Sequence, residues 1–166
     1  MKSLYFLAET NAKFFASTPE SLPLAAFPRY AHPMAHWLIK SEPSSYSWDD
    51  LIRDGKTEWE GVRNNAARLH LRAMKAGDRA FFYRSLVEPA VVGVVAVSRG
   101  PAPDPRDSAW VSIEVTPIEP IGPVTLKAIK AEAALADMIL LRQSRLSVAP
   151  VRKEEWDRIL AMGQTA

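Results

Sequence analysis

A lysine, a hydroxyl and a carboxylate stand together where an apolar run ends. Lys40, Ser41 and Glu42 directly follow the apolar run Trp37–Ile39, and the aromatic Trp48 comes soon after. These three polar groups are able to bind a ligand's polar edge or to transfer protons, and a nearby ring offers a stacking surface. The stretch is therefore interpreted either as a solvated loop or as the rim of a ligand pocket.

A second group of this kind is WEGVRNN, residues Trp59–Asn65, in which an aromatic residue and a glycine precede an expected helix start. Free N–H groups at a helix N-terminus attract acceptors and anions, and Val62, Arg63 and Asn64 lie at that point. The planar guanidinium of Arg63 is suited to stacking on a base or gripping a phosphate. The alternative is structural, with Trp59 in the core and Arg63 in a cap or an ion pair.

The strand-like segment FFYRS alternates between two faces. Phe82 and Arg84 are expected on one face, and Phe81, Tyr83 and Ser85 on the other. One face would pack the core, and the other is a candidate pocket wall.

A basic segment, RQSRLSV, lies near the C-terminus and places four polar side chains within six residues: Arg142, Gln143, Arg145 and Ser147. Arginines grouped near a strand commonly meet phosphates, although a solvated turn has the same composition.

Catalytic and cofactor patterns are absent from the sequence. The chain has no cysteine, and its three histidines, His32, His36 and His70, lack the spacing of a zinc site. There is no G-x-S-x-G nucleophile motif and no glycine-rich phosphate loop after a strand. We therefore expect no metal, no cofactor and no nucleotide-binding Rossmann or P-loop fold.

The elements that position these groups alternate between strands and short helices. Strands are expected at Arg79–Leu86, Ala90–Arg99 and Trp110–Ile118, with a proline-rich loop over Gly100–Ser108. Helices are expected after Ser47, which caps a helix ending at Gly55, over Val62–Met74, after Thr125, near Leu135–Leu141, and over Glu154–Met162. Long strands with short helices and at least one antiparallel neighbour pair indicate an α+β domain, in which a small curved sheet or barrel is flanked by helices.

The composition bounds the molecule further. The 166 residues suit one domain, 48% of them are hydrophobic, and the net charge of +2 supports a nucleic-acid partner only through a local patch. No apolar run approaches the length of a membrane span. The lack of cysteine fits a reducing compartment, so a cytoplasmic location is expected.

Residues 1–33 are interpreted as an N-terminal extension. Their short apolar core is interrupted by Glu9 and Lys13, which is unlike a secretory signal, and the prolines that follow are typical of a linker. We predict that translation starts at Met34 and that the folded domain spans residues 34–163.

The motifs WLIKSEP, YSWDDL, WEGVRN, LRAMKAGD, FFY, VVG, PVTL, LLRQ and RLSV occur in an order that resembles the EVE domain family, over roughly Met34 to Gly163. This resemblance implies a PUA-like fold, a small mixed β-barrel flanked by short helices and related to YTH and ASCH domains. It also implies recognition of a modified nucleobase in DNA or RNA, most simply a 5-substituted cytosine, without a catalytic step.

The resemblance implies an aromatic pocket for an extruded base, since stacking supplies affinity and polar groups at the base edge supply specificity. Trp48, Trp59, Phe82 and Tyr83 are the aromatic candidates, and Glu42 is suited to accept from a cytosine N4 amine. The predicted base-binding residues are Lys40, Ser41, Glu42, Trp48, Trp59, Val62, Arg63, Asn64, Phe82, Tyr83 and Ser85. The predicted phosphate contacts are Arg68, Arg142, Gln143, Arg145 and Ser147.

The chain departs from the family pattern at expected pocket positions. Asn65 and Ala66 replace a tyrosine and a glutamine, while Arg84 and Leu86 replace a histidine and an asparagine. These changes bear on which ligand is bound rather than on the fold.

Two other functions stay open at this point. ASCH relatives include metal-free amidohydrolases of acylated cytidine that use a lysine, a hydroxyl and a glutamate, the residue types of Lys40, Ser41 and Glu42. Consecutive strand residues point to opposite faces, so this chemistry requires a twist or bulge. A protein-interaction module without base binding is the third possibility.

Overall fold

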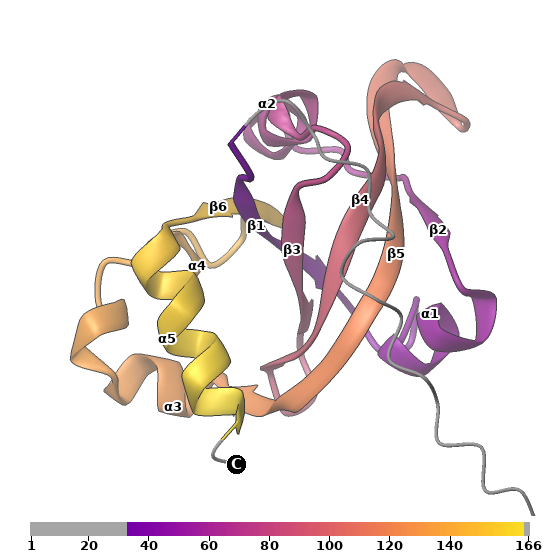
Figure 1. Ribbon diagram of the computed structural model, residues 1–166. Helices are drawn as coiled ribbons and strands as arrows, with labels where there is room; N and C mark the ends of the chain where they lie inside the picture. Colours follow the sequence, from indigo (N-terminus) through magenta and orange to yellow (C-terminus); the bar gives the residue numbers. More distant parts are fainter. Residues whose placement is uncertain (1–32, 165–166) are drawn as a thin grey trace, which may run out of the picture.

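The computed structural model describes residues 33–164, which form one mixed six-stranded sheet with helices on both faces (Figure 1). The strand order is β2-β5-β4-β3-β1-β6, and β1 pairs with β3 in parallel while the other pairs are antiparallel. The strands are β1 (His36–Ser41), β2 (Thr57–Trp59), β3 (Arg79–Arg84), β4 (Ala90–Asp104), β5 (Asp107–Thr125) and β6 (Val148–Val151).

The predicted α+β class, a small mixed and curved sheet flanked by helices, is confirmed, and the sheet of residues 33–164 does not close fully. The edge strands β2 and β6 do not pair with each other within residues 33–164, so the sheet is curved but open. The predictions for residues 1–32 lie outside the part of the chain that the structure describes.

The helices divide between the two faces of the sheet. They are α1 (Trp48–Asp54), α2 (Asn65–Ala73), α3 (Leu126–Ala131), the 3-10 turn η2 (Ala133–Leu135), α4 (Ile139–Arg142) and α5 (Lys153–Gln164). One apolar cluster contains buried residues of α1 and α2, and the other contains those of α3 and α5. Figure 1 shows α3, α4 and α5 gathered on one side of the sheet. No helix within the described residues is long and apolar enough to cross a membrane.

The alternation expected in FFYRS is confirmed. Phe82 packs in the cluster with α1 and α2, while Phe81 and Tyr83 pack in the cluster with α5. The two faces of β3 therefore both serve the core.

The local signals at α1 are also confirmed. Ser47 is the N-cap, and it forms a reciprocal capping box with Asp50. Gly55 ends the helix in the left-handed region, with φ at 73°, where glycine carries no side-chain penalty. This short helix fixes the position of Trp48 at its first turn.

Two sequence predictions require correction. The helix expected from Val62 begins only at Asn65, because Asn64 is its N-cap. The segment Gly100–Ser108, expected as a loop, is mostly strand, since β4 continues to Asp104 and β5 begins at Asp107. Beyond Val97, β4 pairs only with β5 among the described strands, so its outer edge needs no N–H donors and tolerates prolines. The result is a long hairpin that extends past β3 (Figure 1).

Trp48 lies against Gly93 of β4, where a side chain would have no room. A Cβ added at Gly93 would overlap the six-membered ring of Trp48. Gly93→Ala is therefore expected to lower the free energy of unfolding by about 1–3 kcal/mol, as overpacking does. Urea denaturation measures this. Gly100→Ala is the control, because its Cβ would meet only ordinary contacts at 3.7 Å or more. Equal stability of Gly93→Ala and Gly100→Ala would contradict this account of Trp48.

Candidate functional site

A pocket of about 510 Å³ opens between the end of β1, strand β2 and the tip of the β4–β5 hairpin. Its volume lies within the range of roughly 300–1,000 Å³ that is usual for small-ligand sites. The lining residues are Lys40, Ser41, Glu42, Ser45, Tyr46, Thr57, Glu58, Trp59, Glu60, Gly61, Val62, Arg63, Arg106 and Ser147.

The rim at the end of β1 contains a lysine, a hydroxyl and a carboxylate, from Lys40, Ser41 and Glu42. The Lys40 ammonium donates to the Ser144 carbonyl at 2.7 Å, and burial lowers the pKa of Lys40. The Ser41 hydroxyl donates to the Tyr46 carbonyl at 2.5 Å, so it holds the turn after β1. Glu42 is exposed and forms no ion pair with any described residue. All three line the pocket, and of their side chains Glu42 is the one without a hydrogen bond or ion pair to a residue of the described range 33–164.

Aromatic surface in the pocket comes from Trp59 and Tyr46. Trp59 is 8% exposed and meets Phe82 edge-on, with ring centres 5.7 Å apart. Tyr46 is half-buried, and its hydroxyl donates to the Asp54 carboxylate at 2.9 Å. Val62, 8% exposed, adds an apolar side chain to the wall. A flat, apolar ligand would therefore meet a ring held rigidly by the core.

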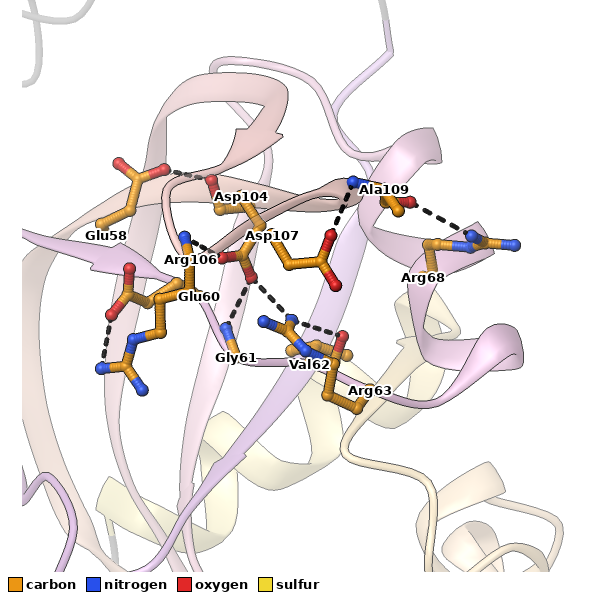
Figure 2. A network of polar contacts seen from close by, with 11 residues as sticks. Glu58, Glu60, Gly61, Val62, Arg63, Arg68, Asp104, Arg106, Asp107 and Ala109 are labelled. Atoms are coloured by element: carbon orange, nitrogen blue, oxygen red, sulfur yellow. Dashed lines mark hydrogen bonds and ion pairs between the residues drawn. The ribbon is translucent and has the colours of Figure 1, made fainter.

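The wall opposite β1 is held by the carboxylate of Asp104 at the hairpin tip. This side chain is fully buried, and it accepts from the Gly61 N–H, the Arg106 N–H and the Arg63 Nη1, each at 2.8 Å. Figure 2 shows the three donors converging on Asp104 from two segments. Gly61 has a φ of 76°, a conformation that favours glycine.

The same contacts set the charge of this wall. The Arg63 guanidinium, together with two backbone N–H groups, holds the pKa of Asp104 far below its usual range. Asp104 stands behind the wall, and of the carboxylates that line the pocket, Glu60 pairs with Arg106 at 2.6 Å and Glu58 pairs with Arg99. Within residues 33–164, Glu42 is thus the one lining carboxylate without an ion pair, which leaves it free to accept hydrogen bonds from a ligand.

Several predicted base-binding residues do not line this pocket. Trp48 packs edge-on against Phe82 at 5.4 Å and lines a separate cavity of about 350 Å³ with it. Tyr83 is buried on the opposite face of the sheet, beneath the Lys40 ammonium. Asn64 caps α2 by accepting from the Ala67 N–H at 3.0 Å, and the Ser85 hydroxyl donates to the Ser41 carbonyl at 3.0 Å. The four aromatic candidates therefore do not form one cage.

The predicted phosphate-contact residues also lie at different places rather than around one pocket. Arg142, Gln143 and Arg145 line a neighbouring cavity of about 330 Å³ together with Asn64 and Ala66. Arg142 is paired with Asp137, whereas Arg145 is exposed and forms no ion pair with a described residue. Ser147 lines the pocket, and its carbonyl accepts from the Lys40 N–H at 2.9 Å.

The four positions that depart from the family pattern all lie outside the pocket. Asn65 is the first residue of α2, and Ala66 lines the neighbouring cavity. Arg84 donates to the Glu88 carbonyl, and Leu86 is exposed with a φ of 67°. None of the four lines the 510 Å³ pocket.

Several residues that build this site were not predicted from the sequence. Tyr46 and Arg106 line the pocket but were not among the predicted base-binding residues, and Arg106 and Asp104, which holds the pocket wall, lay in a segment expected as a loop. Asp104 contacts Gly61 and Arg106 contacts Glu60 across more than 40 residues of sequence, so no local motif predicts these contacts. No group of three or more metal-ligating side chains is arranged to hold an ion in the part of the chain that the structure describes.

Comparison with known proteins gives consistent matches across this domain. The family model of the EVE domain matches residues 35–162. Thymocyte nuclear protein 1 of Gallus gallus is 34% identical, over 76% of this chain and 68% of that protein.

Solved structures are similar in fold. The NMR structure of Rpa0253 from Rhodopseudomonas palustris has a TM-score of 0.76 and 46% identity, covering 80% of this chain and 94% of that one. The crystal structure of human THYN1 protein in complex with 5-methylcytosine-containing DNA has a TM-score of 0.74 and 29% identity, covering 78% of this chain and 98% of that one.

Proposed function

This chain belongs to the EVE domain family, and from that premise we propose that it binds a modified base in DNA, a 5-substituted cytosine, in the 510 Å³ pocket. The observation that carries the proposal is the pairing of a rigid aromatic wall with a free carboxylate in one pocket. Trp59 supplies the wall, and Glu42 supplies the carboxylate. The human relative bound to 5-methylcytosine-containing DNA supports the choice of ligand.

A base enters the pocket only if it is flipped out of the stacked DNA duplex. Enzymes and readers that do this meet the energetic cost of unstacking with stacking on an aromatic side chain and hydrogen bonds to the base edge. Trp59 would provide the stacking, worth about 1–3 kcal/mol per base. Glu42 would accept from the cytosine N4 amine, which thymine lacks. Ser41 and Arg63 would frame the pocket rather than read the base, since both are engaged within the protein.

A hydrolase that uses Lys40, Ser41 and Glu42 has less support. The Lys40 ammonium and the Ser41 hydroxyl each donate to a backbone carbonyl, at 2.7 Å and 2.5 Å, which leaves neither poised as a base or nucleophile. Incubation with N4-acetylcytidine followed by chromatography separates the two functions. Binding without release of cytidine is expected, and release of cytidine at a rate that Lys40→Ala abolishes would favour the enzyme.

Recognition of the cytosine N4 amine by Glu42 is testable by substitution. In oligonucleotides that carry 5-methylcytosine, cytosine or thymine at one position, Glu42→Gln is expected to reduce the preference for 5-methylcytosine over thymine. The expected reduction is about tenfold, since a specific contact of this kind is worth roughly 1–3 kcal/mol. Fluorescence anisotropy at fixed salt measures the ratio of dissociation constants.

The matched control is Asp49→Asn, an exposed carboxylate on α1 that does not line the pocket. It is expected to leave the ratio within twofold of the wild-type value. An unchanged ratio in Glu42→Gln, or an equal change in Asp49→Asn, would contradict the assignment of Glu42.

A further inference from the structure

Three side chains from separate segments stack beside the pocket. The guanidinium carbon of Arg63 lies 5.5 Å from the ring centre of Trp110, and that of Arg68 lies 5.0 Å from the same ring. Arg63 precedes α2, Arg68 is within α2, and Trp110 belongs to the first residues of β5, close to the tip of the β4–β5 hairpin. Such contacts are favourable because the ring face carries negative charge density.

The two arginines differ in how their charge is compensated. Arg63 is paired with the buried carboxylate of Asp104 at 2.8 Å. Arg68 forms no ion pair with any carboxylate of residues 33–164, and its Nη1 donates only to the Ala109 carbonyl at 3.3 Å. Its Nε is buried and has no hydrogen-bond acceptor within the described residues. Arg68 is thus an oriented cation with no anion beside it among residues 33–164.

The position of Arg68 leaves part of the guanidinium available. Figure 2 shows Arg68 at the edge of the polar network, with a terminal nitrogen pointing away from Ala109 and from Asp104. Its Nη2 forms no hydrogen bond with the described residues. A planar guanidinium with free donors, held by stacking, matches the geometry of a phosphate.

We propose that Arg68, held against Trp110, binds a backbone phosphate of the DNA strand whose base enters the pocket. The proposal rests on the proposed function, because the pocket wall residue Arg63 stacks on the same ring and so places this phosphate next to the extruded nucleotide. Trp110 is a positioning residue: it orients the guanidinium and does not itself contact the base.

Arg68→Gln tests the proposal through affinity and its salt dependence. The variant is expected to weaken binding to modified and unmodified oligonucleotides alike, by about 10- to 150-fold, since hydrogen bonds between charged groups are of this strength. The slope of log affinity against log salt concentration should fall by about 1, the value for one lost phosphate contact. The ratio between modified and unmodified ligands should stay unchanged.

Two further variants distinguish a specific phosphate site at Arg68 from a nonspecific effect of positive charge on DNA affinity. Arg72→Gln removes an exposed cation one turn further along α2 that makes no contact with Trp110, and it is expected to change the slope by less than half as much. Trp110→Leu keeps the Arg68 charge but removes the stacking ring, and it is expected to weaken affinity with the slope retained. Circular dichroism and thermal unfolding verify that each variant is folded.

The outcomes distinguish this inference from the proposed function. A wild-type slope in Arg68→Gln, or an equal loss in Arg72→Gln, would overturn the phosphate site while the preference for the modified base stands. A wild-type protein that binds modified and unmodified oligonucleotides equally would overturn the proposed function. In that case the salt slope of Arg68→Gln still decides whether the phosphate site exists.

Discussion

Replacement of Trp59 by alanine is expected to remove the preference for modified DNA. The ring is the proposed stacking surface for the modified base, and without it binding of modified DNA should weaken by about 1–3 kcal/mol, or roughly 5- to 150-fold, toward that of unmodified DNA. Because Trp59 is also buried, the free energy of unfolding should fall by about 3–5 kcal/mol. Trp59→Leu retains apolar packing without the ring, and it provides a folded variant for the same binding assay.

Trp48 supplies the matched control for this experiment. Both tryptophans meet Phe82 edge-on at similar distances, but only Trp59 lines the 510 Å³ pocket. Trp48→Leu should therefore lower stability and leave the ratio of affinities for modified and unmodified DNA unchanged. A loss of selectivity in Trp48→Leu that matches Trp59→Leu would mean that the base binds elsewhere, in the cavity lined by Trp48.

Replacement of Asp104 by alanine is expected to be the most damaging change to the wall opposite β1. It would leave the N–H groups of Gly61 and Arg106 and the guanidinium of Arg63 without their acceptor. Breaking a buried pair costs about 3–5 kcal/mol, and the partial exposure of Arg63 reduces this to roughly 2–4 kcal/mol. Urea denaturation near pH 7 measures the loss of stability, and anisotropy at the same pH should show weakened binding.

The effect of Asp104 has a defined pH dependence. Its pKa in the folded protein is lowered, chiefly by Arg63, so its contribution is fully present above the unfolded carboxyl pKa of about 3.9. The contribution is lost as the pH falls from there through the lower folded pKa, because over this range the unfolded carboxyl binds a proton that the folded one does not. The stability difference between the wild type and Asp104→Ala should therefore be constant above about pH 5 and shrink in acid.

Asp107 is the control for Asp104 within the same hairpin. Its exposed carboxylate accepts only from the Ala109 N–H, at 3.1 Å, so Asp107→Ala is expected to cost less than about 1 kcal/mol. Equal losses in the two variants, or a difference that does not shrink in acid, would contradict the role given to the buried carboxylate.

The sequence predicted features that depend on neighbours along the chain. The caps at Ser47 and Thr125, the glycine end of α1 and the alternation within FFYRS are all local patterns, and the structure contains each of them. The α+β class followed from the same signals. The open edge of the sheet did not, since it depends on how far the strands curve and not on any one residue.

Contacts between distant segments could not be predicted in the same way. Asp104 reaches Gly61 across 43 positions, and the prolines around it favoured a loop over a hairpin. Trp48 and Trp59 are both aromatic residues beside polar ones, and the sequence does not tell which of them lines the pocket. The space above Gly93, which the Trp48 ring occupies, is visible only in the structure. The stacking of Arg68 on Trp110 is likewise visible only once α2 and β5 lie side by side.

The central claim is that a modified cytosine enters the pocket lined by Trp59, and an NMR titration tests it most directly. On addition of a 5-methylcytosine oligonucleotide, the Trp59 indole N–H and the amides of Glu42, Gly61 and Val62 should shift and saturate together. The unmodified oligonucleotide should produce smaller shifts at these sites at equal concentration. Shifts confined to other parts of the domain, or equal shifts with both oligonucleotides, would contradict the account.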